Sequence, residues 1–156
     1  MITVNHKGRS FMVVHEAEDG WPVTSVRLSL RVPLPQGVAI HPAGTAPWSA
    51  GRIGSQTFQT GDAGFDHVFS ARADARSDLR VLEAPEIRRL LVAAAGQHPG
   101  LWIGHDAVVV AERGHVRGGE RLESVLDEVA TIAAVIEATA AGAKAAKMKD
   151  PSGSAA

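Results

Sequence analysis

Apolar and polar residues alternate through a segment in the first quarter of the chain. Val26, Leu28, Leu30 and Val32 are separated by single polar residues, which gives the segment one apolar and one polar face. A short apolar run, 11–14, precedes it, and Glu18-Asp19-Gly20 is a turn sequence between the two. The pattern predicts a β-hairpin over 10–32, to which residues 2–5 can add an edge strand.

The next segment, 33–54, is interrupted by Pro33, Pro35, Pro42 and Pro47 and by glycines, which excludes a long helix. Within it only 38–40 is typical of a strand. Trp48 either covers the core or offers a contact surface. We favour core cover, because large aromatic side chains contribute most through burial.

Helical spacing begins at Phe65 and Phe69, which lie one turn apart and can anchor a short helical turn to the core. Residues 70–75 can then extend as a strand. Pro85, followed by Glu86, is typical of a first helical turn, and the break at 98–100 predicts that this helix stops near Gly96.

The C-terminal third contains a predicted hairpin and a long predicted helix. Residues 101–103 and 107–111 form the hairpin around Gly104-His105-Asp106. After Gly118-Gly119, apolar residues recur at helical spacing, at Leu122, Val125, Leu126, Val129, Ile132, Ala133 and Ile136. The pattern ends past Gly142. We therefore predict one α+β domain over 1–146, with a mostly antiparallel sheet in one or two curved parts, covered by the Pro85 helix and the long C-terminal helix, and a disordered tail over 147–156.

One set of spacings resembles a known family. Phe65-Asp66-x-x-Phe69, an extended piece containing Asp74, Leu82-x-x-Pro85 opening a helix, and then a hairpin are similar to the C-terminal region of a bacterial domain family of unknown function. Many members carry this domain after two membrane-spanning helices, which this chain lacks, and asparagine is more frequent where Asp66 stands. Phe65, Phe69 and Pro85 are framework residues, so the resemblance implies a fold and carries over no catalytic residues.

Composition and charge argue against several classes of function and kinds of site. The formal net charge is −1, which disfavours general binding to nucleic acid, and the absence of cysteine excludes disulfides and zinc-thiolate sites. No window provides the ~20 successive apolar residues of a membrane-spanning helix. The first residues lack the unbroken apolar run of a signal peptide. A cytoplasmic setting is the default expectation, and the sequence predicts no cofactor.

Asp62, Asp66 and His67 form a dense polar cluster beside a glycine-rich turn. If the later hairpin folded toward them, His105-Asp106 or His115 could complete a site for a divalent metal or a general base. The alternative is that the two aspartates cap short helical turns while His67 faces solvent, and we favour it because aspartate is common in caps without any chemistry.

Two functions follow from these alternatives. The framework residues favour a non-catalytic interaction or scaffolding domain, with another protein or a second copy of the chain as partner. The competing prediction is a small-ligand or metal-binding domain, or a hydrolase, that uses Asp62, Asp66, His67 and His105. Self-association through the last helix is a further possibility, because its alanine-rich flanks allow close helix approach.

Overall fold

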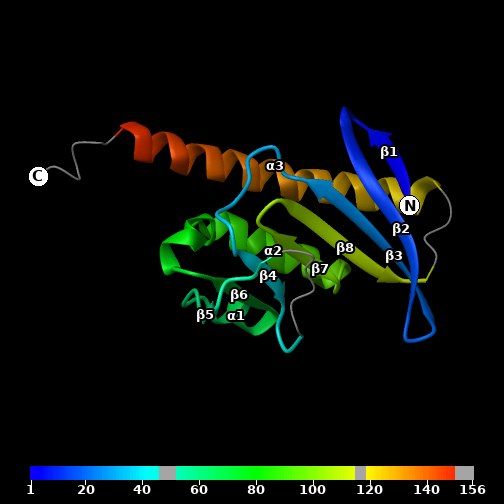
Figure 1. Ribbon diagram of the computed structural model, residues 1–156, viewed down its shortest axis with the longest axis horizontal. Helices are drawn as coiled ribbons and strands as arrows, with labels where there is room; N and C mark the ends of the chain where they lie inside the picture. Colours follow the sequence, from blue (N-terminus) through cyan, green and yellow to red (C-terminus); the bar gives the residue numbers. More distant parts are fainter. Residues whose placement is uncertain (46–51, 115–118, 150–156) are drawn as a thin grey trace, which may run out of the picture.

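The computed structural model describes residues 1–45, 52–114 and 119–149, and an eight-stranded antiparallel sheet forms its centre. The strand order is β1-β2-β3-β8-β7-β4-β6-β5, so the sheet is one continuous layer rather than two parts. Figure 1 shows the N-terminal strands side by side with β8, and α3 crossing the sheet diagonally. The α+β fold and the mostly antiparallel sheet are confirmed.

The first three strands form a meander with two tight turns. They are β1 (Ile2–His6), β2 (Arg9–Glu18) and β3 (Trp21–Ser29). Lys7-Gly8 and Asp19-Gly20 occupy the turns, and all four residues have positive φ, as two-residue turns of type I′ require. The predicted hairpin and edge strand are confirmed.

The predicted end of β3 is wrong by three residues, because the strand stops at Ser29 instead of Val32. The N–H of Leu30 donates to the carbonyl of Asp106 and that of Leu34 to the carbonyl of His105, at 2.7 Å each. Here the backbone passes the turn of the hairpin 101–111 instead of continuing the hydrogen-bonded ladder of β3. Pro33, which has no N–H to donate, lies between these two bonds.

The middle of the chain supplies β4 (Ala39–Pro42), β5 (Gln56–Phe58), α1 (Ala63–Val68) and β6 (Phe69–Ala73). The helical turn and the two longer strands were expected from the sequence. The short edge strand β5 was not, because three residues carry no recognisable period. Trp48 and His115 lie outside the described residues.

The rest of the chain forms η1 (Arg76–Glu83), α2 (Pro85–Gln97), β7 (Leu101–Gly104), β8 (Ala107–Arg113) and α3 (Gly119–Lys149). Pro85 begins α2 as predicted, and the hairpin 101–111 is confirmed. The 3₁₀ segment η1 was not predicted. The boundary expected at 146 falls within α3, and residues 150–156 lie outside the described part of the chain.

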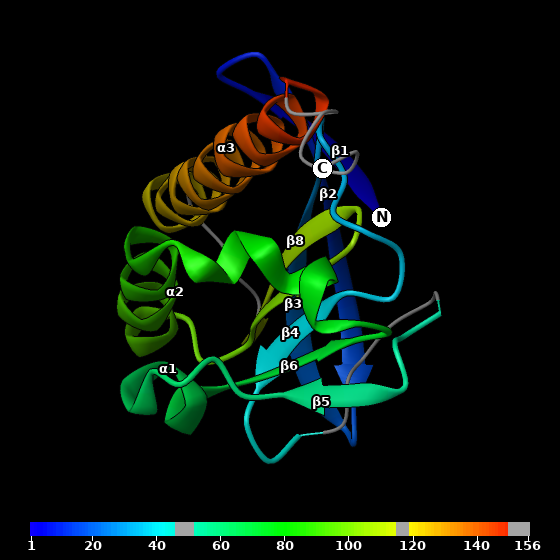
Figure 2. The same ribbon diagram turned by 90° about the vertical axis from the view of Figure 1, so that its left-hand side faces the viewer.

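The helical segments lie to one side of the sheet (Figure 2). Helix α3 packs on β3 and β8 and also contacts α2 and η1. Its buried residues Val125, Leu126, Val129, Ile132, Ala133 and Ile136 follow the predicted helical stripe. We call the side of the sheet that bears these helices the helix face and the other side the open face.

Candidate functional site

Asp62, the first predicted site residue, is the N-cap of α1. One of its carboxylate oxygens accepts a hydrogen bond from the N–H of Phe65 at 3.2 Å, and the other accepts one from Nε of Arg88 at 3.0 Å. The hydrogen bond from Arg88, followed by that from Phe65, holds the pKa of Asp62 below its usual value. Arg88 also donates to the carbonyls of Leu82 and Glu83, so Asp62 ties α1 to the start of α2.

Asp66 holds the loop that leads into α1. Its carboxylate accepts hydrogen bonds from the N–H and the hydroxyl of Thr60 and from the N–H of Gly61, at 2.8 to 3.1 Å. His67 is exposed, and Phe65 is buried with its ring stacked on that of Phe69, 5.2 Å between centroids. In these contacts the two aspartates accept from the backbone and from neighbouring side chains.

His105 lies at the other end of the sheet from α1. Strand β6 begins at Phe69, directly after α1, and Phe69 pairs with Pro42 at one end of β4. Gly104, next to His105, pairs with Ala39 at the opposite end of β4. The structure thus brings Asp62 and Asp66 into one turn but does not bring His105 to them. Among the residues that the structure describes, no three His, Asp or Glu side chains are placed to hold one metal ion.

A different polar network joins α2, β8 and α3. His98, the C-cap of α2, is 1% exposed, with Nδ1 2.8 Å from a carboxylate oxygen of Glu112 and Nε2 2.5 Å from one of Glu128. Arg121 donates to Glu112 at 2.6 Å. Each of the two ring nitrogens therefore has a carboxylate oxygen as its hydrogen-bond partner. The near-complete burial of the ring leaves a substrate no approach, so we interpret this network as structural.

No local sequence signal marks this network. His98 precedes Pro99-Gly100 and resembles an ordinary turn residue, and Glu112 and Glu128 are typical of solvated faces. Their convergence depends on how α3 lies across the sheet, which spacing along the chain does not specify.

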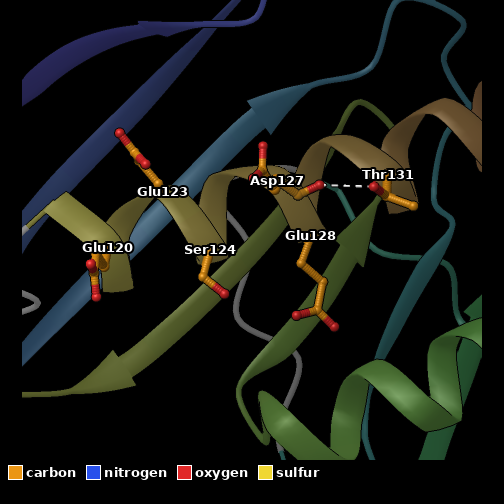
Figure 3. A pocket seen from close by; sticks show the side chains of 6 residues that line it. All are labelled: Glu120, Glu123, Ser124, Asp127, Glu128 and Thr131. Carbon is orange, nitrogen blue, oxygen red and sulfur yellow. Dashed lines mark hydrogen bonds between the residues drawn. The ribbon is translucent and has the colours of Figure 1, made fainter.

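The first turns of α3 carry an acidic strip that consists of Glu120, Glu123, Asp127 and Glu128. Together with Ser124 and Thr131 they line a shallow, open depression (Figure 3). Glu123 and Glu128 point to opposite sides of the helix, and the hydroxyl of Thr131 donates to the carbonyl of Asp127. Asp127 binds His6 at the end of β1 and Lys7 in the turn that follows, and the hydrogen bonds from Lys7 and then His6 lower the pKa of Asp127. Two members of the strip are therefore engaged within the fold.

A better enclosed hollow of about 390 Å³ lies on the open face. We call it the open-face hollow. It is lined by Glu16, Ala17, Glu18, Val23, Ser25, Pro42, Thr45, Gly100, Trp102, Val109 and Ala111. These residues come from β2, β3, β4, β7 and β8 and from positions just outside β4 and β7, so strands far apart in the sequence line the hollow.

Two glycines shape the floor of the hollow. A Cβ on Gly104 would lie 2.9 Å from the indole of Trp102, and a Cβ on Gly100 would lie 2.1 Å from the carbonyl oxygen of Ala111. Glycine at these positions lets the indole lie across the strand and lets the chain approach β8 closely. Val109 is paired with Trp102 in the register and is buried beside it.

The rim of the hollow is acidic and aromatic. Glu16 and Glu18 are exposed on β2, and no ion pair involves either of them within the described residues. Trp21 is opposite Glu18 in the register and is 61% exposed. The unbroken apolar run in β7 and β8 indicates only that both faces of these strands are buried, so the sequence carries no specific signal for the hollow.

None of the described helices is both long enough and apolar enough to cross a membrane. No family model matches the chain, and comparisons with curated proteins and with solved structures give no match either. The resemblance to the bacterial domain family therefore stays a prediction.

Proposed function

We propose that this chain is a non-catalytic interaction domain that binds a segment of a partner protein in the open-face hollow. The observation that carries the proposal is an apolar floor bordered by two exposed carboxylates and an exposed indole. The partner segment that fits this surface has an apolar side chain next to a lysine or arginine.

The apolar part of the partner would fill the floor. An open sheet face is usually polar, yet Val23, Trp102 and Val109 form an apolar surface here. A concave, mostly apolar hollow with a few polar groups at its edge is typical of binding sites. A hollow of a few hundred Å³ holds one or two aliphatic side chains.

The basic part of the partner would meet the rim. Its aliphatic stem can lie against the ring of Trp21, while its cation interacts with the indole and with Glu16 and Glu18. Arg113 is in register with Val23 and is exposed at the same end of the sheet, so the rim also contains one competing cation. Charges of this kind set specificity and association rate more than affinity.

Binding can be measured with short synthetic peptides. A ten-residue peptide with a central Leu-Arg-Leu-Lys segment is titrated into the protein, and the same peptide with Glu in place of Arg and Lys serves as comparison. Tryptophan fluorescence reports on binding, since the chain has three tryptophans and no tyrosine. We expect the basic peptide to bind and the acidic one not to bind.

Charge variants distinguish binding in the open-face hollow from a general attraction of the basic peptide to acidic side chains. Glu16→Gln/Glu18→Gln should weaken binding of the basic peptide about tenfold, because both rim carboxylates are lost. Glu83→Gln/Glu86→Gln makes the same change in charge on η1 and α2, away from the hollow, and should leave the affinity unchanged. Equal binding of both peptides, or equal weakening by both double variants, would contradict the proposal.

A further inference from the structure

The outermost strand β1 has an unpaired outer side within the described sheet, because the sheet order places it at one end. The two-residue turn at Lys7-Gly8 makes His6 and Arg9 a hydrogen-bonded pair. Hydrogen-bonded and non-hydrogen-bonded pairs alternate along an antiparallel ladder, so the backbone N–H and C=O groups of Val4 and Ile2 also bond to β2. The N–H and C=O groups of Thr3 and Asn5 therefore point away from the sheet.

The neighbouring hairpin confirms this alternation. By the same rule the backbones of Glu18 and Trp21 form a hydrogen-bonded pair across the Asp19-Gly20 turn. The backbone of Pro22 is then directed away from β2. The carbonyl of Pro22 accepts a hydrogen bond from Gly114, beyond the end of β8, at 2.7 Å. Pro22 thus stands where its missing N–H costs β2 nothing.

Exposed apolar side chains gather at the same edge. Of the large hydrophobic residues that are exposed in the described part of the chain, Met1, Ile2 and Met12 lie on or beside β1, at 86%, 56% and 40% exposure. Strand β1 contains no proline and no Asp, Glu, Lys or Arg, which are the residues that protect sheet edges from pairing. The opposite edge strand, β5, is only three residues long.

We propose that β1 pairs with β1 of a second copy of this chain, antiparallel and about a two-fold axis at Thr3. Two-fold symmetry makes the pairing antiparallel, so Thr3 faces Thr3 of the other copy, and Met1 faces Asn5. All of these residues present outward N–H and C=O groups. Ile2 then lies opposite Val4 of the other copy, twice, as an apolar cross-strand pair.

Charge favours a second copy as the occupant. Because β1 carries no formal charge, two copies meet without like charges within the strand. At the C-terminal end of β1, the side chains of His6 and Lys7 both lie within 2.8 Å of the carboxylate of Asp127 in the same chain. Asp127 thus compensates the positive charge of Lys7 next to the interface. The proposal uses no residue of the open-face hollow, so it and the proposed function can fail separately.

Molar mass by light scattering across a concentration series tests the pairing. We expect the full chain to move from 16.3 kDa toward twice that mass as concentration rises. Thr3→Pro removes an N–H that β2 does not use and should weaken the dimer about tenfold or more, while Thr3→Ala keeps that N–H and should not. Circular dichroism checks that both variants fold. Ile2→Lys places a charge at the exposed edge and tests the interface without a proline.

Cross-linking tests the register. The chain has no cysteine, so a single introduced thiol reports on one contact. Under oxidising conditions Thr3→Cys should give a covalent dimer, because facing residues of paired strands lie within disulfide range. Thr57→Cys on β5 is the matched control and should stay monomeric. A monomer at every concentration, an unweakened Thr3→Pro dimer, or equal cross-linking of both cysteine variants would overturn the proposal.

Discussion

His41 is a buried histidine that shows how one side chain can set a pH dependence. It lies on β4, 4% exposed, with Nδ1 3.2 Å from the carbonyl oxygen of Pro42, and its Nε2 is buried without a hydrogen-bond partner in the described structure. Burial lowers the pKa of His41 below its ordinary value of 6.5, the Pro42 carbonyl opposes this, and the charge of Arg72 adds to the lowering. The folded protein therefore keeps this imidazole neutral at mildly acidic pH.

The sign of the resulting pH effect follows from proton binding. Just below 6.5 the unfolded chain protonates His41 to a greater extent than the folded chain does, so the unfolded state binds more protons and stability falls as pH falls through this window. We expect His41→Gln to flatten the pH dependence of the unfolding free energy just below 6.5, by at most about 1.4 kcal/mol per pH unit for one proton. Urea unfolding at several pH values measures it, with His67→Gln, at an exposed site, as control. A His41→Gln profile parallel to that of the unaltered chain would contradict the assignment.

Residue types around the predicted site were informative about local structure. Asp62 caps α1, as its place before the Phe65 turn predicts, because a cap needs only a few neighbouring residues. Its second partner, Arg88, follows 26 positions later and depends on how α2 returns to α1. Local sequence specified the cap, but it could not specify the ion pair.

At the scale of elements, Glu137 fastens α3 to the sheet. In the sequence it only interrupts an apolar stretch. In the structure it is buried, and its carboxylate accepts two hydrogen bonds from the guanidinium of Arg9, at 2.6 and 2.9 Å, and one from the N–H of Arg31. The hydrogen bond from Arg9 is the main cause of the lowered pKa of Glu137, which keeps the carboxylate ionised.

Arg9→Met should therefore destabilise the protein by about 3–5 kcal/mol, because it leaves a buried carboxylate without its cation. The double variant Arg9→Met/Glu137→Leu should lose less, since both charges are gone. Chemical denaturation of the two single variants and the double variant gives the coupling energy. Losses that simply add would show that Arg9 and Glu137 do not act as a pair.

Strands and helices could be predicted where the spacing of apolar residues and the residues typical of turns or helix starts indicate the same element. Asp19-Gly20 marked a hairpin and Pro85 marked a helix start, and both elements formed there. The segments that were missed, β5 and η1, are short and are held by contacts with β6 and α2 rather than by a period of their own. Their backbone geometry depends on neighbours that sequence spacing does not reveal.

At the scale of the whole molecule, the order of the strands exceeded what the sequence could specify. Hairpins follow from local turns, but the pairing of β3 with β8 and of β4 with β7 joins segments separated by long stretches of chain. Apolar strands of similar character could pair in several orders. Burial by α3, which contacts β3, β8, α2 and η1, favours the observed one.

The His98 network tests whether this assembly depends on polar contacts between separate elements. His98→Leu would leave Glu112 and Glu128 facing an apolar side chain, with Arg121 still bound to Glu112 alone. We expect a loss of about 3 kcal/mol, which corresponds to a fall of roughly 6–12 °C in Tm for a domain of this size. Adding Glu128→Gln should recover part of the loss, because a neutral amide tolerates the missing donor better than a carboxylate does. If Glu128→Gln instead lowers the Tm further in the His98→Leu background, the two carboxylates do not depend on the imidazole. The contact between α2, β8 and α3 would then be held by apolar packing.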